Sequence, residues 1–264
     1  MIHLAVSNNN MNHKKFIIIS FLSLLCFLAR AQAQAGYQPG EELEFVIRYG
    51  FIVGGKAVAT LRDTVMEGKN ALVARMVAKS AGIADYIYRV LDVYETSFDP
   101  ITVLPIKSTR DISEGDYKRY EEVTFYHSEN YIINTKNEKV EVPKGTIDMV
   151  TAFYKIRRNN YNNYINGQII DIDTYFDNEV FPFDIRYRGI ETIKTGLGEF
   201  ECIKFVPFVE PGRIFKTEDD MTIWVTNDKN LIPVRFRLDL LIGSIKCDLV
   251  SYKNLKYPLS SLIE

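Results

Sequence analysis

The sequence predicts a mainly β protein: a curved antiparallel sheet or open β-barrel that one α-helix, at about residues 146–158, partly closes. Segments rich in β-branched and aromatic residues recur along the chain, and Asn, Asp or Gly residues separate most of them. One segment, residues 146–158, shows a clear helical period. No linker rich in Pro, Gly or Ser interrupts residues 34–264, so we expect them to form a single domain.

The first half of this domain contains long strand patterns. Residues 42–49, 56–65, 71–79 and 117–127 alternate between apolar and polar side chains or run apolar. In the third of these segments, apolar side chains occupy alternate positions from Leu72 onward, which is typical of a strand with one buried face. We therefore expect half-buried strands in this part of the chain.

The second half predicts hairpins at close spacing, the pattern of an antiparallel sandwich or barrel. The expected strands are residues 168–175, 180–188, 191–194, 199–208, 221–226, 231–240 and 244–252. Asn, Asp and Gly in the connections supply the positive φ angles that tight turns need. Pro207 and Pro233 fall at strand ends, where a missing N–H is tolerated.

One amphipathic helix is predicted at Thr146–Arg158. Thr146 fits the N-cap position, and the basic residues of the last turn suit its partial negative charge. A weaker helical pattern covers residues 83–91. The apolar positions of the main helix follow the i, i+3, i+4, i+7 spacing of one face: Met149, Ala152, Phe153 and Ile156.

The start of the chain has the order of a secretory signal peptide. Lys14 and Lys15 precede an apolar run at residues 16–28, and residues 31–33 supply an A-x-A cleavage site. The run is shorter than the roughly 20 apolar residues that span a bilayer. The pattern therefore predicts removal of this segment and no membrane anchor.

We expect residues 1–33 to be the signal peptide, with Gln34 as the first residue of the mature protein. Met11 is better placed than Met1 as an initiator, in which case residues 1–10 are a mis-assigned start. The mature chain would contain no transmembrane helix. Its location would be the periplasm or the extracellular space.

The charge balance argues against nucleic acid as a partner. Without residues 1–33 the chain holds 29 basic and 34 acidic residues, a net charge of −5. Proteins that bind phosphate backbones need a basic face. We expect no nucleic-acid partner.

Residues 50–57, GFIVGGKA, have the glycine and lysine spacing of a phosphate-binding loop. Ala57 occupies the place of the Ser or Thr that would bind magnesium, and a strand pattern follows where a helix would be needed. We therefore expect no nucleotide. Gly54 and Gly55 are a favoured pair for the turn of a hairpin, and we predict a turn there.

The chain contains few residues of the types that usually act in catalysis. His127 is the one histidine that remains without the leader, which excludes a Ser-His-Asp triad and a His-rich metal site. Carboxylates are the remaining acid–base groups. They occur near Arg89, next to Arg110 and as an adjacent pair: Asp85, Asp92, Glu95 and Asp99; Asp111; and Asp219 and Asp220. Most such residues form a solvated or salt-bridged surface. We expect that the protein is not an enzyme and that it binds no cofactor and no metal.

Two cysteines remain in the mature chain, Cys202 and Cys247. An exported protein can hold them as a disulfide. Both lie in strand patterns, where a small buried thiol is the favoured interpretation.

Five blocks follow one another over residues 38–255. They are ELEFVIRYGFIVGGKAVATL, YRVLDVYETSFDPITVLPIK, IDMVTAFYKIR, YRGIETIKTGLGEFECIKFVP and MTIWVTNDKNLIPVRFRLDLLIGSIKCDLVSY. Their order resembles the bacterial exported family catalogued as domain of unknown function 3108. The family carries no assigned activity, so the resemblance implies no site residues.

The end of the chain is also similar to the end of periplasmic lipoprotein-carrier proteins. The shared features are a strand with Trp224, a polar turn, a bend at Gly243 and a last strand. Those proteins fold as an incomplete β-barrel around a helix and hold acyl chains inside. The likeness is one of fold and carries function only by analogy.

Together these observations predict a non-catalytic protein of the cell envelope whose partner is an apolar or lipid-like molecule or another envelope component. The candidate ligand-binding residues are Phe51, Tyr86, Met149, Phe153, Ile156 and Trp224. Two alternatives remain open. A scaffold or assembly protein would show a flat apolar patch, and a carboxylate-based hydrolase of envelope glycans would bring two carboxylates together in a cleft.

Overall fold

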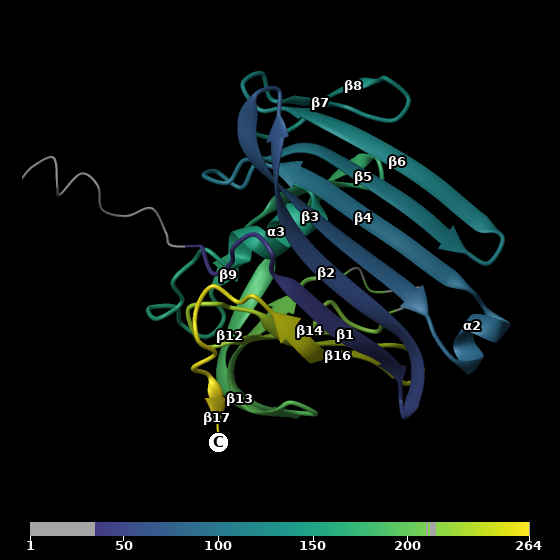
Figure 1. Cartoon of the computed structure of the whole chain (residues 1–264), viewed down its shortest axis with the longest axis vertical. Helices are drawn as coiled ribbons and strands as arrows, with labels where there is room; N and C mark the ends of the chain where they lie inside the picture. The colour runs from purple at the N-terminus through teal and green to yellow at the C-terminus, as the bar shows by residue number, and fades with distance from the viewer. Residues whose placement is uncertain (1–34, 210, 212–214, 264) are drawn as a thin grey trace, which may run out of the picture. The chain divides into compact units, whose positions relative to one another are not determined.

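The computed structural model describes residues 35–209, 211 and 215–263. The predicted signal peptide, residues 1–33, and its cleavage site lie outside this range. Residues Ala35–Glu264 form one unit dominated by a large antiparallel sheet that does not close into a barrel. The mainly β fold predicted from the sequence is confirmed (Figure 1).

The first half of the unit is a meander in which consecutive strands pair. Its strands are β1 (Glu42–Tyr49), β2 (Ile52–Met66), β3 (Lys69–Ser80), β4 (Val90–Phe98), β5 (Pro105–Glu114), β6 (Tyr117–Tyr126), β7 (Tyr131–Ile133) and β8 (Lys139–Glu141). A short helix, α2 (Ile83–Ile87), links β3 to β4. The predicted alternation is present in β3, where Leu72 and Ala74 are buried.

The second half forms another meander in the same sheet. Its strands are β9 (Ile169–Ile170), β12 (Ile185–Thr195), β13 (Gly198–Pro207), β14 (Met221–Thr226), β15 (Pro233–Asp239), β16 (Ser244–Lys253) and β17 (Leu262–Ile263). The two meanders meet where β1 pairs with β16 in antiparallel register, from Glu42 opposite Lys253 to Tyr49 opposite Ile245. Strands β10 (Asp173–Phe176) and β11 (Glu179–Pro182) form a separate two-stranded sheet.

Helix α3 (Met149–Ile156) connects the two halves and lies against β3, β4 and β10, on the concave side of the curled sheet (Figure 1). Its N-cap is Asp148, and the prediction of Thr146 was wrong. The Asp148 carboxylate accepts a 2.7 Å hydrogen bond from the Thr151 amide, while the Thr151 hydroxyl accepts one from the Asp148 amide. This reciprocal capping box satisfies two N–H groups at once. The Thr146 hydroxyl instead donates to the Pro143 carbonyl, in the preceding turn.

The predicted turn at Gly54 and Gly55 was also wrong. The chain turns four residues earlier, at Gly50 and Phe51, where Gly50 has a φ of 58°. Gly54 and Gly55 lie inside β2, as does Lys56, so the predicted absence of a helix at that lysine is confirmed. A register shift between β1 and β2 lies beside these glycines, after Ile47.

The hairpin at Asp177 and Asn178 is confirmed, since both residues have positive φ angles of 56° and 68°. The strands around it differ from the prediction. Residues 168–175 divide into β9 and β10, and residues 180–188 divide between β11 and β12. Strand β12 continues to Thr195 because Gly189, with a φ of 92°, accommodates a register shift that joins the two segments predicted there.

Neither α2 nor α3, the helices found in the described part of the chain, has the length and hydropathy needed to cross a membrane.

Candidate functional site

An apolar cavity of about 250 Å³ lies between α3 and the sheet. Strands β1–β3 form one wall, strands β12–β16 form another, and the helix borders the cavity. The lining residues are Phe45, Ala57, Val58, Ala59, Met76, Met149, Phe153, Ile156, Arg157, Phe183, Ile185, Phe205, Met221, Ile223, Val225, Leu231, Pro233, Phe236 and Cys247. Arg157 is the one charged residue in this lining, as far as the structure describes the chain.

Strand alternation places the side chains of the second wall. On β14, Met221, Ile223 and Val225 line the cavity, whereas the intervening Trp224 does not. Ile223 lies opposite Phe236 on β15, which also lines the cavity. Residues opposite one another in an antiparallel pair share a face of the sheet, so this wall presents a continuous apolar surface.

The helix separates the cavity from a second packed region. Met149, Phe153 and Ile156 border the cavity, whereas Val150 and Tyr154 are buried in a cluster with residues of β2, β3 and β4. The helix is therefore apolar over more of its circumference than the single face predicted from its spacing. The buried side holds the helix in place, and the other side borders the cavity.

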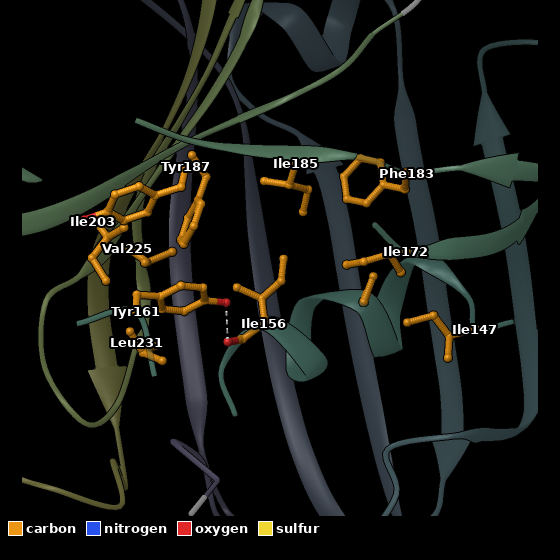
Figure 2. Close-up of a cluster of buried hydrophobic side chains, with 12 residues drawn as sticks. Ile147, Ile156, Tyr161, Ile172, Phe183, Ile185, Tyr187, Ile203, Val225 and Leu231 are labelled. Atoms are coloured by element: carbon orange, nitrogen blue, oxygen red, sulfur yellow. Dashed lines mark hydrogen bonds between the residues drawn. The ribbon is translucent and has the colours of Figure 1, made fainter. Parts of the chain in front are cut away.

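Figure 2 shows a cluster of buried side chains next to the cavity; Ile156, Phe183, Ile185, Val225 and Leu231 belong to both the cluster and the cavity lining. Tyr161 belongs to this cluster and donates a 2.8 Å hydrogen bond to the Ile156 carbonyl, at the end of α3. A buried phenol that finds such a partner keeps an apolar body in the core without an unsatisfied hydroxyl. Burial raises the pKa of this phenol, which remains protonated.

Arg157 anchors the helix beside the cavity. It is 1% exposed and pairs with Glu41, itself 2% exposed, through hydrogen bonds of 2.5 and 2.7 Å. The guanidinium also donates to the carbonyls of Gly36 and Asn230, at 2.8 and 3.0 Å. Burial acts to lower the pKa of Arg157, and the adjacent Glu41 carboxylate more than offsets it. With these partners Arg157 is engaged in holding the fold, and the cavity is chemically apolar.

The two cysteines are free thiols. Cys247 on β16 lines the cavity, while Cys202 on β13 is completely buried outside its lining. Strands β14 and β15 lie between them in the sheet. Adjacent strands are about 4.8 Å apart, and a disulfide needs Cα atoms within about 7 Å. The disulfide that the sequence allowed is therefore not formed, and burial raises the pKa of each thiol to about 12.

The structure brings together three of the six candidate ligand-binding residues: Met149, Phe153 and Ile156. The side chains of Phe51 and Tyr86 are 93% and 92% exposed and lie outside the cavity lining. Trp224 is 7% exposed, and its indole N–H donates to the Glu191 carboxylate.

The sequence did not single out the aromatic and sulfur-containing side chains of the walls, among them Phe45, Met76 and Phe236. Alternation identifies them as members of a buried face. It does not show that this face borders a cavity, because that depends on the pairing of β1 with β16. The sequence places Arg157 in the last turn of the predicted helix. Its ion pair with Glu41 could not be predicted, because the two residues are far apart in the sequence.

Several of the carboxylates predicted as acid–base candidates are held by nearby groups. Glu95 pairs with Arg75 at 3.0 Å, and Asp219 pairs with Arg186 at 2.7 Å. Asp85 accepts a hydrogen bond from Ser80. Within the described ranges, no carboxylate lines the cavity and no cluster of His, Cys, Asp and Glu residues could hold a metal ion.

The fold and the cavity define an open antiparallel β protein that curls around one helix and encloses apolar space. The chain belongs to the family described as "Protein of unknown function (DUF3108)", whose model matches residues 44–250. The family resemblance predicted from the five sequence blocks is confirmed.

One solved structure supports this architecture, and a second is reported for comparison. A beta-barrel-like protein of the domain of unknown function DUF1849 from Brucella abortus superposes with a TM-score of 0.53 and 10% identity, over 83% of this chain and 98% of that one. A candidate exported protein with a YmcC-like fold from Bacteroides fragilis covers 83% and 100%, also at 10% identity, with a TM-score of 0.34. The first similarity supports the fold alone. A search of curated proteins finds no match.

Proposed function

We propose that this protein binds an apolar or lipid-like molecule in the cavity beside α3 and that it is not an enzyme. The observation that carries the proposal is the cavity itself, which is bordered by Met149, Phe153 and Ile156 and lined almost wholly by apolar side chains. Ligand sites of this kind are mostly apolar, with few polar groups.

The size of the cavity narrows the class of ligand. Engineered apolar cavities of about 150 Å³ take up benzene, and pockets for drug-sized molecules begin at about 300 Å³. A volume of about 250 Å³ lies between these values. It suits one acyl chain or one small ring system, and each buried CH₂ group would contribute about 0.8 kcal/mol.

The chemistry of the lining favours binding over catalysis. A general acid or base must lie within hydrogen-bond reach of the reacting group. The charged lining residue, Arg157, is committed to Glu41 and two carbonyls, and the Cys247 thiol has a pKa raised by burial to about 12. Thiolate chemistry would therefore be disfavoured at neutral pH.

We extend the proposal to the cell envelope as the place of action. The support is the signal-peptide pattern of residues 1–33, and an apolar ligand is available in that compartment.

The test measures uptake of the uncharged dye N-phenyl-1-naphthylamine by fluorescence, with decanol as the competitor. We expect saturable uptake by the wild type. Ala57→Phe places a phenyl ring into the cavity and should weaken dye affinity by about tenfold or more, which corresponds to 1.4 kcal/mol. Val46→Phe places the same ring on the face of β1 that points away from the cavity, where Val46 is paired with Lys56 and Asp248, and it should leave the affinity unchanged.

A second readout needs no substitution. Decanol should slow the alkylation of Cys247, which lines the cavity, while Cys202 stays unreactive because it is completely buried. Absence of dye uptake by the wild type would contradict the proposal. So would equal affinities of the two phenylalanine variants together with alkylation that decanol does not affect.

A further inference from the structure

We propose that one end of the molecule binds the surface of an anionic lipid membrane. This turn end consists of the β1–β2 turn (residues 49–53), the segment that contains α2 (residues 83–88) and the β15–β16 turn (residues 241–242). The surface is distinct from the cavity, and membrane binding does not depend on what the cavity holds.

One hydrogen bond joins two segments of the turn end, and a second lies directly beside the β1–β2 turn and α2. The Tyr49 hydroxyl donates a 2.9 Å hydrogen bond to the Ile242 carbonyl. The backbone amide of Ala81, just before α2, donates to the Gly54 carbonyl at 3.0 Å. The three segments, which come from distant parts of the sequence, therefore form one surface.

Large apolar side chains protrude from each segment. Phe51 is 93% exposed, Tyr86 is 92%, Ile242 is 80% and Ile87 is 74%. Leaving such side chains in water is unfavourable by about 25 cal/mol for each Å² of apolar surface. Protruding aromatic and aliphatic tips fit the interface of a bilayer, where aromatic side chains are enriched.

A row of basic residues lies beside these tips, on the face of the sheet that points away from the cavity. Arg48 is opposite Lys246, and Lys56 is opposite Lys79. None of these four side chains forms an ion pair with any described residue.

The basic row favours an anionic lipid surface as the partner of the turn end. The whole chain has a net charge of −2, so the positive charge is local. Basic residues beside apolar ones are the combination that binds anionic lipid surfaces. A second copy of the chain is disfavoured because a two-fold contact through the turn end would bring two basic rows together.

The turn end also adjoins the cavity. An apolar hollow of about 410 Å³, lined in part by Ile47, Ala78 and Ile87, lies at this end. Ala78 is opposite Ala57, a residue of the cavity lining, so the two spaces lie along the same face of the same strands. A membrane at the turn end would meet the route by which a lipid could reach the cavity, a relation that rests on the proposed function.

The test is flotation with vesicles of phosphatidylethanolamine and phosphatidylglycerol, with phosphatidylcholine vesicles for comparison. The protein is the chain from Ala35 to Glu264, which contains every described strand and helix. The triple variant Phe51→Ser, Tyr86→Ser, Ile242→Ser should bind the anionic vesicles about tenfold or more weakly.

The matched control is Val65→Ser, Ile101→Ser, Ile165→Ser, whose side chains are 63%, 61% and 73% exposed and lie outside the turn end. This control should bind as the wild type does. The charge variant Lys56→Glu, Lys79→Glu should lose about fivefold for each lysine and most of the dependence on NaCl concentration. It tests the surface independently if the serine variant fails to fold.

Three outcomes would overturn the proposal. The wild type could fail to float with anionic vesicles, the triple variant and its control could bind equally, or binding could be the same on phosphatidylcholine and insensitive to salt. Sedimentation analysis adds one more: a dimer that the triple variant abolishes would assign the turn end to a second copy of the chain. Dye uptake by the cavity is measured in a separate experiment, so the membrane proposal and the cavity proposal can each fail without the other.

Discussion

Arg157 ties three distant segments together through its guanidinium group. Glu41 precedes β1, Gly36 lies near the start of the described residues, and Asn230 is in the β14–β15 connection. Asn230 itself donates to the carbonyl of Tyr257, which extends the network to the C-terminal segment. Polar contacts thus fix both ends of α3, and apolar contacts fix the turns between them.

We expect Glu41→Gln to lower the free energy of unfolding by about 3–5 kcal/mol, because it leaves the buried Arg157 charge without its counter-ion. Urea unfolding followed by circular dichroism measures the change. Glu42→Gln is the control: Glu42 is adjacent in sequence, but its ion pair with Lys253 lies on the surface. That control should be nearly neutral, and equal losses in both variants would contradict the assignment of Glu41 and Arg157 as a buried anchor.

The pairing of β2 with β3 depends on a close approach at Gly55. A Cβ atom at this position would lie 2.6 Å from the Lys79 carbonyl oxygen, which is backbone and has little freedom to move. At Gly54, a Cβ atom would find its nearest neighbour at 4.0 Å. Neither glycine has a positive φ angle, so steric space and not backbone conformation distinguishes the two positions.

Gly55→Ala should therefore destabilise the protein by about 1–3 kcal/mol, the usual cost of overpacking. Gly54→Ala should change stability by much less, because the added methyl group has room. Thermal unfolding of the two variants side by side measures the difference. Equal melting temperatures would show that β2 and β3 adjust without cost.

Individual strands were predictable because their signals are local. Residues 42–49 were predicted as a strand and form β1, and the Asn and Asp residues at 177 and 178 turn as expected. The turn at Gly50 was missed because Gly54 and Gly55 are the stronger turn signal. The close approach of the Lys79 carbonyl, about 24 residues along the chain, explains why a glycine occupies position 55 in the interior of a strand.

The two meanders share one sheet, one helix and overlapping apolar clusters, so we expect them to unfold as a unit. Trp224 on β14 is the single tryptophan of the chain and reports on the second meander. Its fluorescence and the far-ultraviolet circular dichroism of the whole sheet should give the same midpoint in urea. Two separated midpoints would show that the meanders are independent domains.

The architecture was predictable only in outline. A curved sheet with an internal helix follows from turn spacing and from the apolar face of Met149, Phe153 and Ile156. The cavity does not, because its walls are brought together by the pairing of β1 and β16 over about two hundred residues, which no local pattern encodes. The turn end could not be predicted for the same reason. In the sequence, Phe51 lies between two strand patterns and Tyr86 in a helical pattern, and no local signal brings the three separate segments together.

The pairing of β1 with β16 also determines the order in which the sheet can be completed. Synthesis delivers β1 among the first strands and β16 among the last, so one edge of β1 has no partner while most of the chain is being made. Unpaired strand edges are templates for aggregation, and non-local pairing is slow. The nascent protein therefore spends its most vulnerable period with β1 exposed, and the arrival of the C-terminal strands ends that period.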